Sequence, residues 1–228
     1  MRVELGATEE EAVEACGLGA ARFSGPPVEQ EQAIAMLDLL AHWWSQPVAD
    51  ELAVWLGARD VVEELAAQAP GPVGSLLEKV AGPDEMLLAY EELLIGPGPV
   101  PCPPYESYWR NDVGIDIRRT LMGPCIVELN RLYGEMGLEV KPNSGELPDH
   151  LALEFEALAY SLSRSDGERI AHELFFEHLK KWLPRFCSTV IRESRQPFYV
   201  DLARLTRDWL EALSPFFDSI AQNELTAG

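Results

Sequence analysis

Hydrophobic residues recur at three- and four-residue steps along most of this chain, which is the period of an α-helix. The clearest stripe predicts a helix over residues 28–46 that Pro47 ends. Further helices, most of them closed by glycine or proline, are predicted over 49–56, 58–69, 83–95, 115–136 with a kink or a break near Gly123 at Pro124, 148–163, 168–182, 184–193 and 197–213. No segment long enough for a strand alternates apolar and polar residues with period two. We therefore expect an all-α fold, a single globular helical bundle of about nine to eleven helices.

A proline-rich loop over residues 96–112 interrupts this pattern, with prolines at 97, 99, 101, 103 and 104. So many prolines exclude both a helix and a central strand. Tyr105, Tyr108 and Trp109 follow, and aromatic rings beside an extended backbone suit an apolar peptide. Glu106 adds a negative charge for an arginine. The alternative is a rigid crossover that packs these aromatics into the core.

The loop divides the chain into predicted parts. Residues 1–27 form an N-terminal extension, and residues 28–228 form one helical domain. Within that domain we expect a helical part over 28–95, the loop over 96–112, and a second helical part over 113–228.

The chain of 228 residues carries a net charge of −20, which is unevenly spread. Residues 1–100 contribute −14 and residues 101–228 contribute −6. Such a field repels nucleic acid and anionic lipid, and it favours a basic partner, although solubility alone would also explain it. There is no apolar run of about 18 residues and no secretory leader pattern, so we expect no stable membrane insertion and a cytoplasmic location.

A second candidate segment is Glu-Leu-Pro-Asp-His at 146–150. Asp149 and His150 are predicted in the first turn of a helix, where a carboxylate is favoured by the helix dipole. His150 and Glu154 lie four residues apart on one face, so they could hold a metal or act as a general base. The alternative is a histidine hydrogen-bonded at a helix start. No metal-ligand spacing joins His172 and His178, and no phosphate-binding loop is present.

Four stretches, taken in order, resemble the TorD/DmsD/NarJ family of cytoplasmic chaperones for molybdenum redox enzymes. They are Tyr-Glu-Glu-Leu-Leu-Ile-Gly-Pro at 90–97, Pro-Pro-Tyr-Glu-Ser at 103–107, the segment at 146–150, and the aromatic pattern over 175–210. Leu94 stands where the family usually has phenylalanine, and Tyr105 where it often has tryptophan.

The resemblance implies an all-α chaperone with no catalysis and no cofactor. Such a protein binds the twin-arginine signal peptide and the apo form of a molybdopterin oxidoreductase, and it holds back export until cofactor insertion and folding are complete. It would be a monomer or a helix-swapped homodimer. The resemblance implies a peptide-binding surface made of Tyr90, Leu93, Leu94, Pro104, Tyr105, Glu106, Ser107, Trp109, Asp149 and His150.

Two other functions stay open at this point. One is an all-α metal-dependent enzyme that uses His150 with Glu154 or Asp149. The other is weak binding of guanine nucleotides, against which the missing phosphate loop argues.

Overall fold

The computed structural model describes residues 28–47, 76, 78–96, 99–110, 123–141 and 145–227, with side chains up to residue 219. The described part is helical, and its sole extended pairing is an isolated antiparallel bridge between Tyr105 and His150. The predicted all-α class is confirmed. The predicted extension over 1–27, the helices at 49–56 and 58–69, and the part of 115–136 before Gly123 lie outside the described residues.

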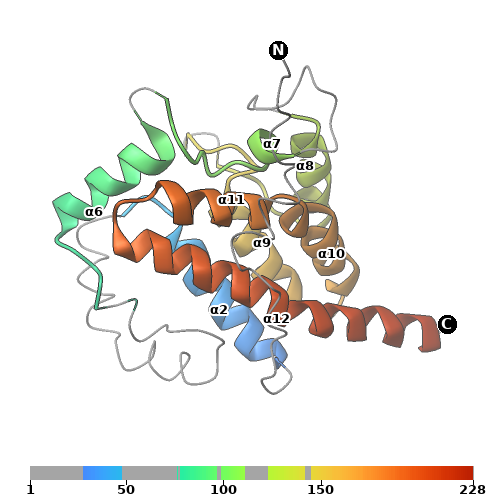
Figure 1. Ribbon diagram of the computed structural model, residues 1–228. Helices are drawn as coiled ribbons and strands as arrows, with labels where there is room; N and C mark the ends of the chain where they lie inside the picture. Colours follow the sequence, from blue (N-terminus) through green and yellow to red (C-terminus); the bar gives the residue numbers. More distant parts are fainter. Residues whose placement is uncertain are drawn as a thin grey trace, which may run out of the picture.

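Two helix pairs build the core. Helix α2 (Gln30–Trp43) packs along α9 (Leu151–Ser163), and α11 (Lys180–Glu193) packs along α12 (Pro197–Ala227). Figure 1 shows α11 and α12 folding back on each other, with α2 and α9 behind them. Trp44, at the end of α2, is fully buried and donates from Nε1 to Thr206 Oγ1 over 2.9 Å, so it ties the two pairs together.

Helix α6 (Pro83–Tyr90) runs into a π-helical turn, η1 (Glu91–Ile95), at one edge of the bundle. Pro83 occupies the first turn together with two acidic residues, which the positive end of the helix dipole favours. Gly96 ends the segment with a φ of +82°, a conformation that glycine adopts without strain. The predicted helix over 83–95 is confirmed, whereas its π-helical end was not predicted.

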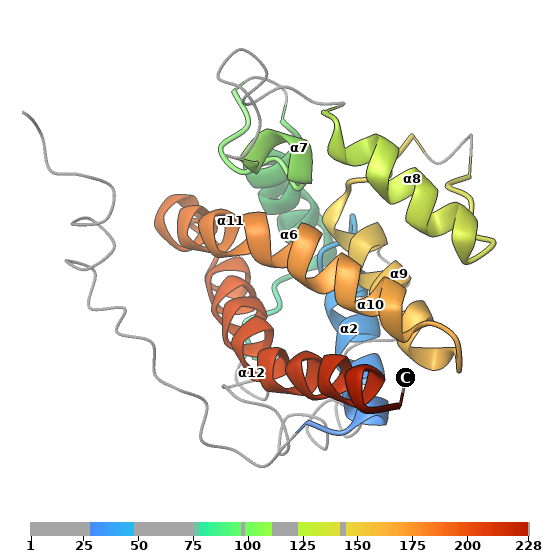
Figure 2. The same ribbon diagram turned by 90° about the vertical axis from the view of Figure 1, so that its right-hand side faces the viewer.

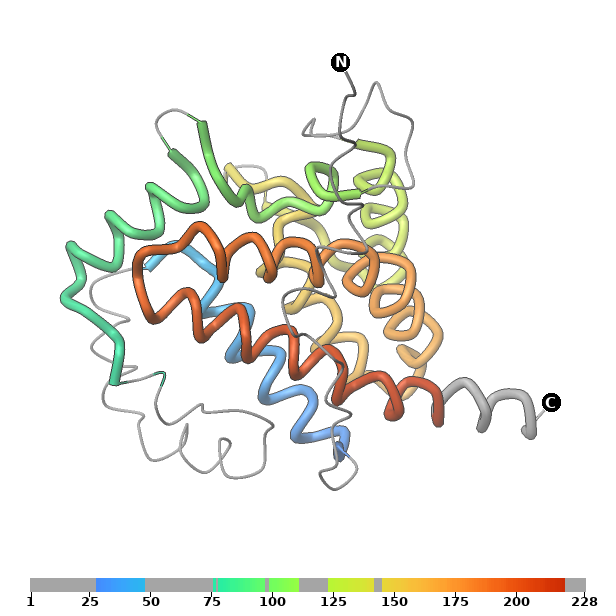
Figure 3. Tube along the Cα trace, in the orientation of Figure 1, coloured from blue at the N-terminus to red at the C-terminus, as the bar shows by residue number. Residues whose placement is uncertain are grey.

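The chain then crosses the bundle to α7 (Glu106–Trp109) and α8 (Cys125–Glu135), as the tube in Figure 3 shows. Figure 2 places α7 and α8 at the same end of the molecule. Helix α9 begins at Leu151, with His150 as its N-cap residue, so the prediction that Asp149 and His150 lie in its first turn is wrong. His150 has an extended backbone, with ψ at 134°, which places it outside the helix.

The C-terminal half departs from prediction in two places. Helix α10 (Glu168–Glu173), a π-helical segment η3 (Leu174–Leu179) and α11 are continuous, and Pro184 lies inside α11 on an exposed position. The expected break before Pro184 is therefore wrong. Burial of Leu183, Phe186 and Val190 on one face of α11 outweighs the lost backbone hydrogen bond.

Helix α12 likewise continues past the predicted end at Leu213 and through Pro215. Phe217 is fully buried and stacks on Phe175, with ring centroids 4.3 Å apart, which gives the extra turns a packing partner. Among the helices that the structure describes, none combines the length and apolar character that a membrane crossing requires.

Candidate functional site

The proline-rich loop and the 146–150 segment meet in what we call the junction, made of residues 103–110 and 145–151. The Glu106 backbone N–H donates to the Asp149 carbonyl over 3.0 Å, and the Leu151 N–H donates to the Pro104 carbonyl over 2.9 Å. These bonds flank the bridge between Tyr105 and His150. The two segments singled out from the sequence are therefore brought together by backbone hydrogen bonds.

The outer rim of the junction is aromatic and acidic. The Tyr105 hydroxyl donates to Glu146 Oε2 over 3.2 Å, and its ring meets His150 edge to face at 5.2 Å between centroids. Tyr105, Tyr108, Glu146 and Pro148 are each partly exposed. This rim is the part of the junction that a partner can touch directly.

His150 caps helix α9. Its Nδ1 accepts the backbone N–H of Ala152 over 3.2 Å, which satisfies one of the free donors of the first turn. The residue is only 3% exposed, and this burial lowers the pKa of the imidazole, which favours the neutral form. Its Nε2 lies 3.8 Å from Glu146 Oε2. The geometry matches the histidine hydrogen-bonded at a helix start.

Asp149 is completely buried and ties the 146–150 segment to α7. Its Oδ2 accepts the Ser107 backbone N–H over 3.0 Å, while Oδ1 has no hydrogen-bond partner among the described residues. Burial raises the pKa of Asp149, and the hydrogen bond from Ser107 opposes that rise. Asp149 thus holds the shape of the junction.

Glu106 is also completely buried. Its Oε1 accepts from Arg110 Nη1 over 2.5 Å, and its Oε2 lies 2.9 Å from His178 Nδ1. Arg110 Nη1 also donates to the Glu177 carbonyl over 3.1 Å. The sequence predicts that the Glu106 carboxylate binds an arginine of a partner. In the folded chain this carboxylate instead binds Arg110 of the same chain.

Glu154 lies in the same interior. Its Oε2 accepts from Trp182 Nε1 over 3.3 Å, and its Oε1 has no partner in the described part of the chain. Burial, reinforced by the carboxylates of Glu106 and Asp149, raises its pKa well above the usual range. We call Glu106, Ser107, Arg110, Asp149, Glu154 and His178 the buried polar cluster.

The other predicted site residues are mostly interior as well. Tyr90 is fully buried, and its hydroxyl donates to the Trp44 carbonyl over 3.4 Å. Trp109, 6% exposed, donates from Nε1 to the Pro103 carbonyl over 2.7 Å. Leu94 and Pro104 are buried too. These side chains support the junction from within, and a peptide would reach them only after the surface above them opens.

Leu93 is also buried, at 6% exposed, but it borders an open groove of about 570 Å³ that we call the α6 groove. One wall is α6 with η1, and the other is the corner between α11 and α12. The lining residues are Glu85, Leu88, Ala89, Glu92, Leu93, Pro101, Glu193, Ser194, Arg195, Gln196 and Pro197. Apart from Leu93, sequence reasoning missed this groove. Leu88 is a large apolar residue outside the buried face of α6. An apolar residue at such a position could have indicated the groove.

The geometry gives little support to metal or nucleophilic chemistry. No group of three or more histidine, cysteine, aspartate or glutamate side chains in the described part of the chain could hold a metal ion. Glu154 bonds to Trp182, and no hydrogen bond or ion pair joins its side chain to His150. Burial raises the pKa of the Cys102 thiol to about 12 and that of Cys125 further, so both are poor nucleophiles.

Comparisons with known proteins identify the family of this chain. Residues 56–188 match the model of a family described as nitrate reductase delta subunit. The Tat proofreading chaperone DmsD of Salmonella typhi is 29% identical over 143 residues, which cover 63% of this chain and 67% of that protein. The chaperone protein TorD of Salmonella bongori is 20% identical over 199 residues, or 80% of this chain and 90% of that one.

A solved structure of a proposed redox enzyme maturation protein from Archaeoglobus fulgidus shares the fold. It has a TM-score of 0.58 and 23% identity, and the match covers 84% of this chain and 99% of that one. The expectation of a chaperone without catalysis is confirmed by the family and by the relatives, which are chaperones. This chain therefore belongs to the nitrate reductase delta subunit family, and it is a chaperone rather than an enzyme.

Proposed function

We propose that this chaperone serves the maturation of a molybdopterin oxidoreductase by binding the twin-arginine signal peptide of one subunit. Binding would hold back export until cofactor insertion and folding are complete. Membership of the family and the relatives described as Tat proofreading chaperones support the proposal.

The observation that carries the proposal is the junction itself. Two segments about forty residues apart are locked together by backbone bonds, and they leave an aromatic and acidic rim at the surface. A twin-arginine peptide has two arginines followed by an apolar stretch. The partly exposed rings of Tyr105 and Tyr108 suit the apolar stretch, and the carboxylate of Glu146 adds to the negative field that attracts a cationic peptide.

The predicted site residues then divide into two roles. Tyr105 is proposed to touch the peptide directly. Asp149, His150, Glu106 and Ser107 are proposed to act indirectly, because their polar atoms are engaged within the chain and their side chains are buried. They fix the position of the rim that the peptide meets.

A titration tests this proposal. A synthetic peptide with two adjacent arginines and a following run of about ten apolar residues is added to the protein, and binding is followed by calorimetry. We expect micromolar or tighter binding, and a loss of about tenfold or more when both arginines are alanine, because each charge-assisted contact contributes about 1–3 kcal/mol.

The matched variants are Tyr105→Ala and Tyr160→Ala. Tyr160 is a partly exposed tyrosine on α9 outside the junction, 39% exposed, so its loss removes a similar ring from an unrelated surface. Only Tyr105→Ala is expected to weaken the peptide. Absence of binding to the unaltered protein at high micromolar concentration would reject the proposal.

A further inference from the structure

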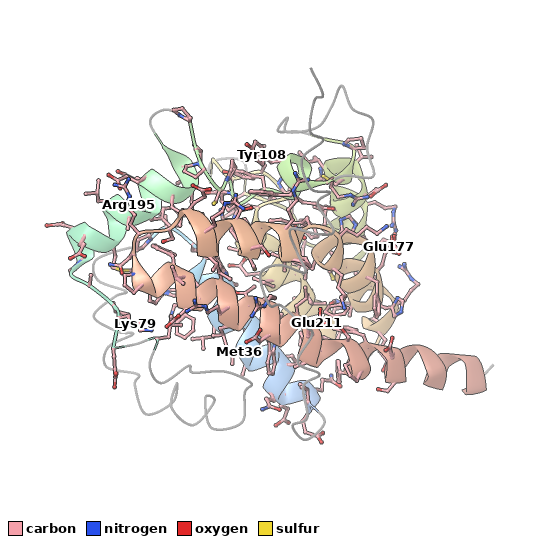
Figure 4. The ribbon with its side chains drawn as sticks, in the orientation of Figure 1. Met36, Lys79, Tyr108, Glu177, Arg195 and Glu211 are labelled. Carbon is pink, nitrogen blue, oxygen red and sulfur yellow. The ribbon has the colours of Figure 1, made fainter. Side chains whose placement is uncertain are left out.

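We propose that the two adjacent arginines of the signal peptide bind in the α6 groove, with one guanidinium on each wall. This inference rests on the proposed function and names the subsite that reads the arginine pair. The groove lies where Figure 1 shows α6 beside the turn that joins α11 and α12, and Figure 4 marks the turn by the label on Arg195.

The lining of the groove is partly apolar, and some of it is exposed among the residues that the structure describes. Leu88 is 55% exposed, whereas Met86 and Tyr90 of the same helix are 2% and 0% exposed. Ala89, Leu93, Pro101 and Pro197 continue the apolar surface. Covering such a surface stabilises a complex by about 25 cal/mol for each Å² removed from water.

Its charge favours a cation. Three carboxylates, Glu85, Glu92 and Glu193, line the groove against a single cation, Arg195. Glu92 is exposed, and none of the described residues bonds to its carboxylate. Glu92 can therefore receive a guanidinium without giving up a contact with any residue that the structure describes.

Among the described residues, the other two carboxylates make only weak, exposed interactions. Glu85 accepts one hydrogen bond from Gln196 Nε2 over 3.3 Å across the groove. Glu193 accepts from its neighbour Arg192 over 2.8 Å, and the two side chains are 43% and 66% exposed. An exposed pair of this kind contributes little stability, so an incoming arginine can share or replace it.

The placement of the carboxylates suits adjacent arginines in particular. Glu92 belongs to the wall formed by α6 and η1, whereas Glu193 belongs to the wall formed by the end of α11. In an extended peptide, successive side chains point to opposite sides. Two adjacent arginines would thus reach both walls at once. Two arginines separated by one intervening residue would point to the same wall.

The groove also leads to the junction. The Leu93 carbonyl accepts the Cys102 N–H over 3.0 Å, so this part of the proline-rich loop is held beside η1. Pro101 lines the groove and lies four residues before Tyr105, and four residues span at most about 14 Å. One peptide can therefore place its arginines in the groove and its apolar stretch over Tyr105.

The test uses two peptides, one with adjacent arginines and one with a single alanine between them, followed by the same apolar run. The double variant Glu92→Gln/Glu193→Gln is compared with Glu139→Gln/Asp218→Asn, which removes the same charge from exposed sites that do not line the groove. We expect the groove variant to bind the adjacent-arginine peptide about tenfold more weakly and to lose the preference for adjacent arginines. The control variant should keep both.

A third variant acts in the opposite direction. Arg195→Gln removes the cation that lines the groove, so we expect it to tighten the adjacent-arginine peptide by about threefold. If the unaltered protein binds neither peptide, the proposed function fails and this inference with it. If the protein binds and the groove variant keeps both affinity and preference, the inference alone is overturned.

Discussion

The buried polar cluster and the α6 groove use the same residue type in opposite ways. Glu106 of the cluster is completely buried and bound by both Arg110 and His178. Glu92 of the groove, fourteen residues earlier, is exposed, and no bonded partner for it is found within the described ranges. A buried carboxylate with two partners fixes a structure, whereas an exposed carboxylate without a partner is available to another molecule.

This difference separates two meanings of a recognisable motif. The Pro-Pro-Tyr-Glu-Ser and Glu-Leu-Pro-Asp-His segments resemble those of the family because they build the junction, and most of their polar atoms are used inside it. The charges offered to a partner lie on less distinctive residues of α6, η1 and α11. The predictions below test this separation.

The largest effect is expected at Glu106. Glu106→Ala leaves Arg110 and His178 buried without their carboxylate, and removing one partner of a buried pair costs about 3–5 kcal/mol of unfolding free energy. Urea unfolding measures this loss. Glu92→Ala is the comparison, and it should change stability by about 0.5 kcal/mol or less, because Glu92 is exposed. Equal losses in the two variants would contradict the separation.

A smaller loss is expected at Asp149. Asp149→Ala removes the acceptor of the Ser107 backbone N–H, and leaving a buried donor unsatisfied costs about 1–3 kcal/mol. Asp149→Asn is the matched variant, because its amide oxygen can still accept that hydrogen bond although the carboxylate is removed. Thermal unfolding followed by circular dichroism should rank the alanine variant lowest. Full stability of Asp149→Ala together with weakened peptide binding would instead assign Asp149 to direct contact.

The third prediction concerns the pH dependence of stability. Because the pKa of Glu154 is raised in the folded chain, the unfolded chain loses its proton first as the pH rises above the usual value of 4.5. The free energy of unfolding therefore falls with rising pH until the raised pKa is passed. Glu154→Gln keeps an oxygen for Trp182 and cannot ionise, so it should gain stability relative to the unaltered protein as the pH rises.

Two neighbours also contribute to this profile. Asp149 has a raised pKa and adds to the same fall. His150 has a lowered pKa, so below about its usual value of 6.5 the unfolded chain gains a proton and stability falls as the pH drops. The His150 effect is common to the two proteins and cancels in their difference, whereas the Asp149 contribution changes because its carboxylate interacts with that of Glu154. Urea midpoints between about pH 5 and pH 9 provide the measurement, and a constant difference would show that Glu154 does not titrate as its surroundings indicate.

The fold was largely predictable because helical periodicity is a local signal. The stripe in α2 and the stop at Gly137, with its φ of +73°, were visible in the sequence. The continuous helix through Pro184 was not, because it depends on burial of Phe186 and Val190 against distant residues. Local rules treat a proline as a break, and tertiary packing overrode that rule here.

The site was predictable in part. The resemblance to the TorD/DmsD/NarJ family is confirmed, and the two motifs do meet. The spacing of the motif residues did not show whether they face the interior or the solvent. The reason is that the partners of Glu106 include His178, which lies seventy-two residues away in the sequence. The α6 groove was also hidden, since its second wall comes from a corner more than a hundred residues further along the chain.

The smallest expected effect is that of salt on peptide binding. The groove carboxylates are exposed, and screening at higher ionic strength weakens their attraction for arginine. Raising sodium chloride from about 50 to 500 mM should weaken the adjacent-arginine peptide by about threefold, and the Glu92→Gln/Glu193→Gln variant should respond less. The stability of the buried polar cluster should change little over the same range, because buried pairs are screened less. A peptide affinity that does not change with salt concentration would mean that the acidic surface serves solubility alone.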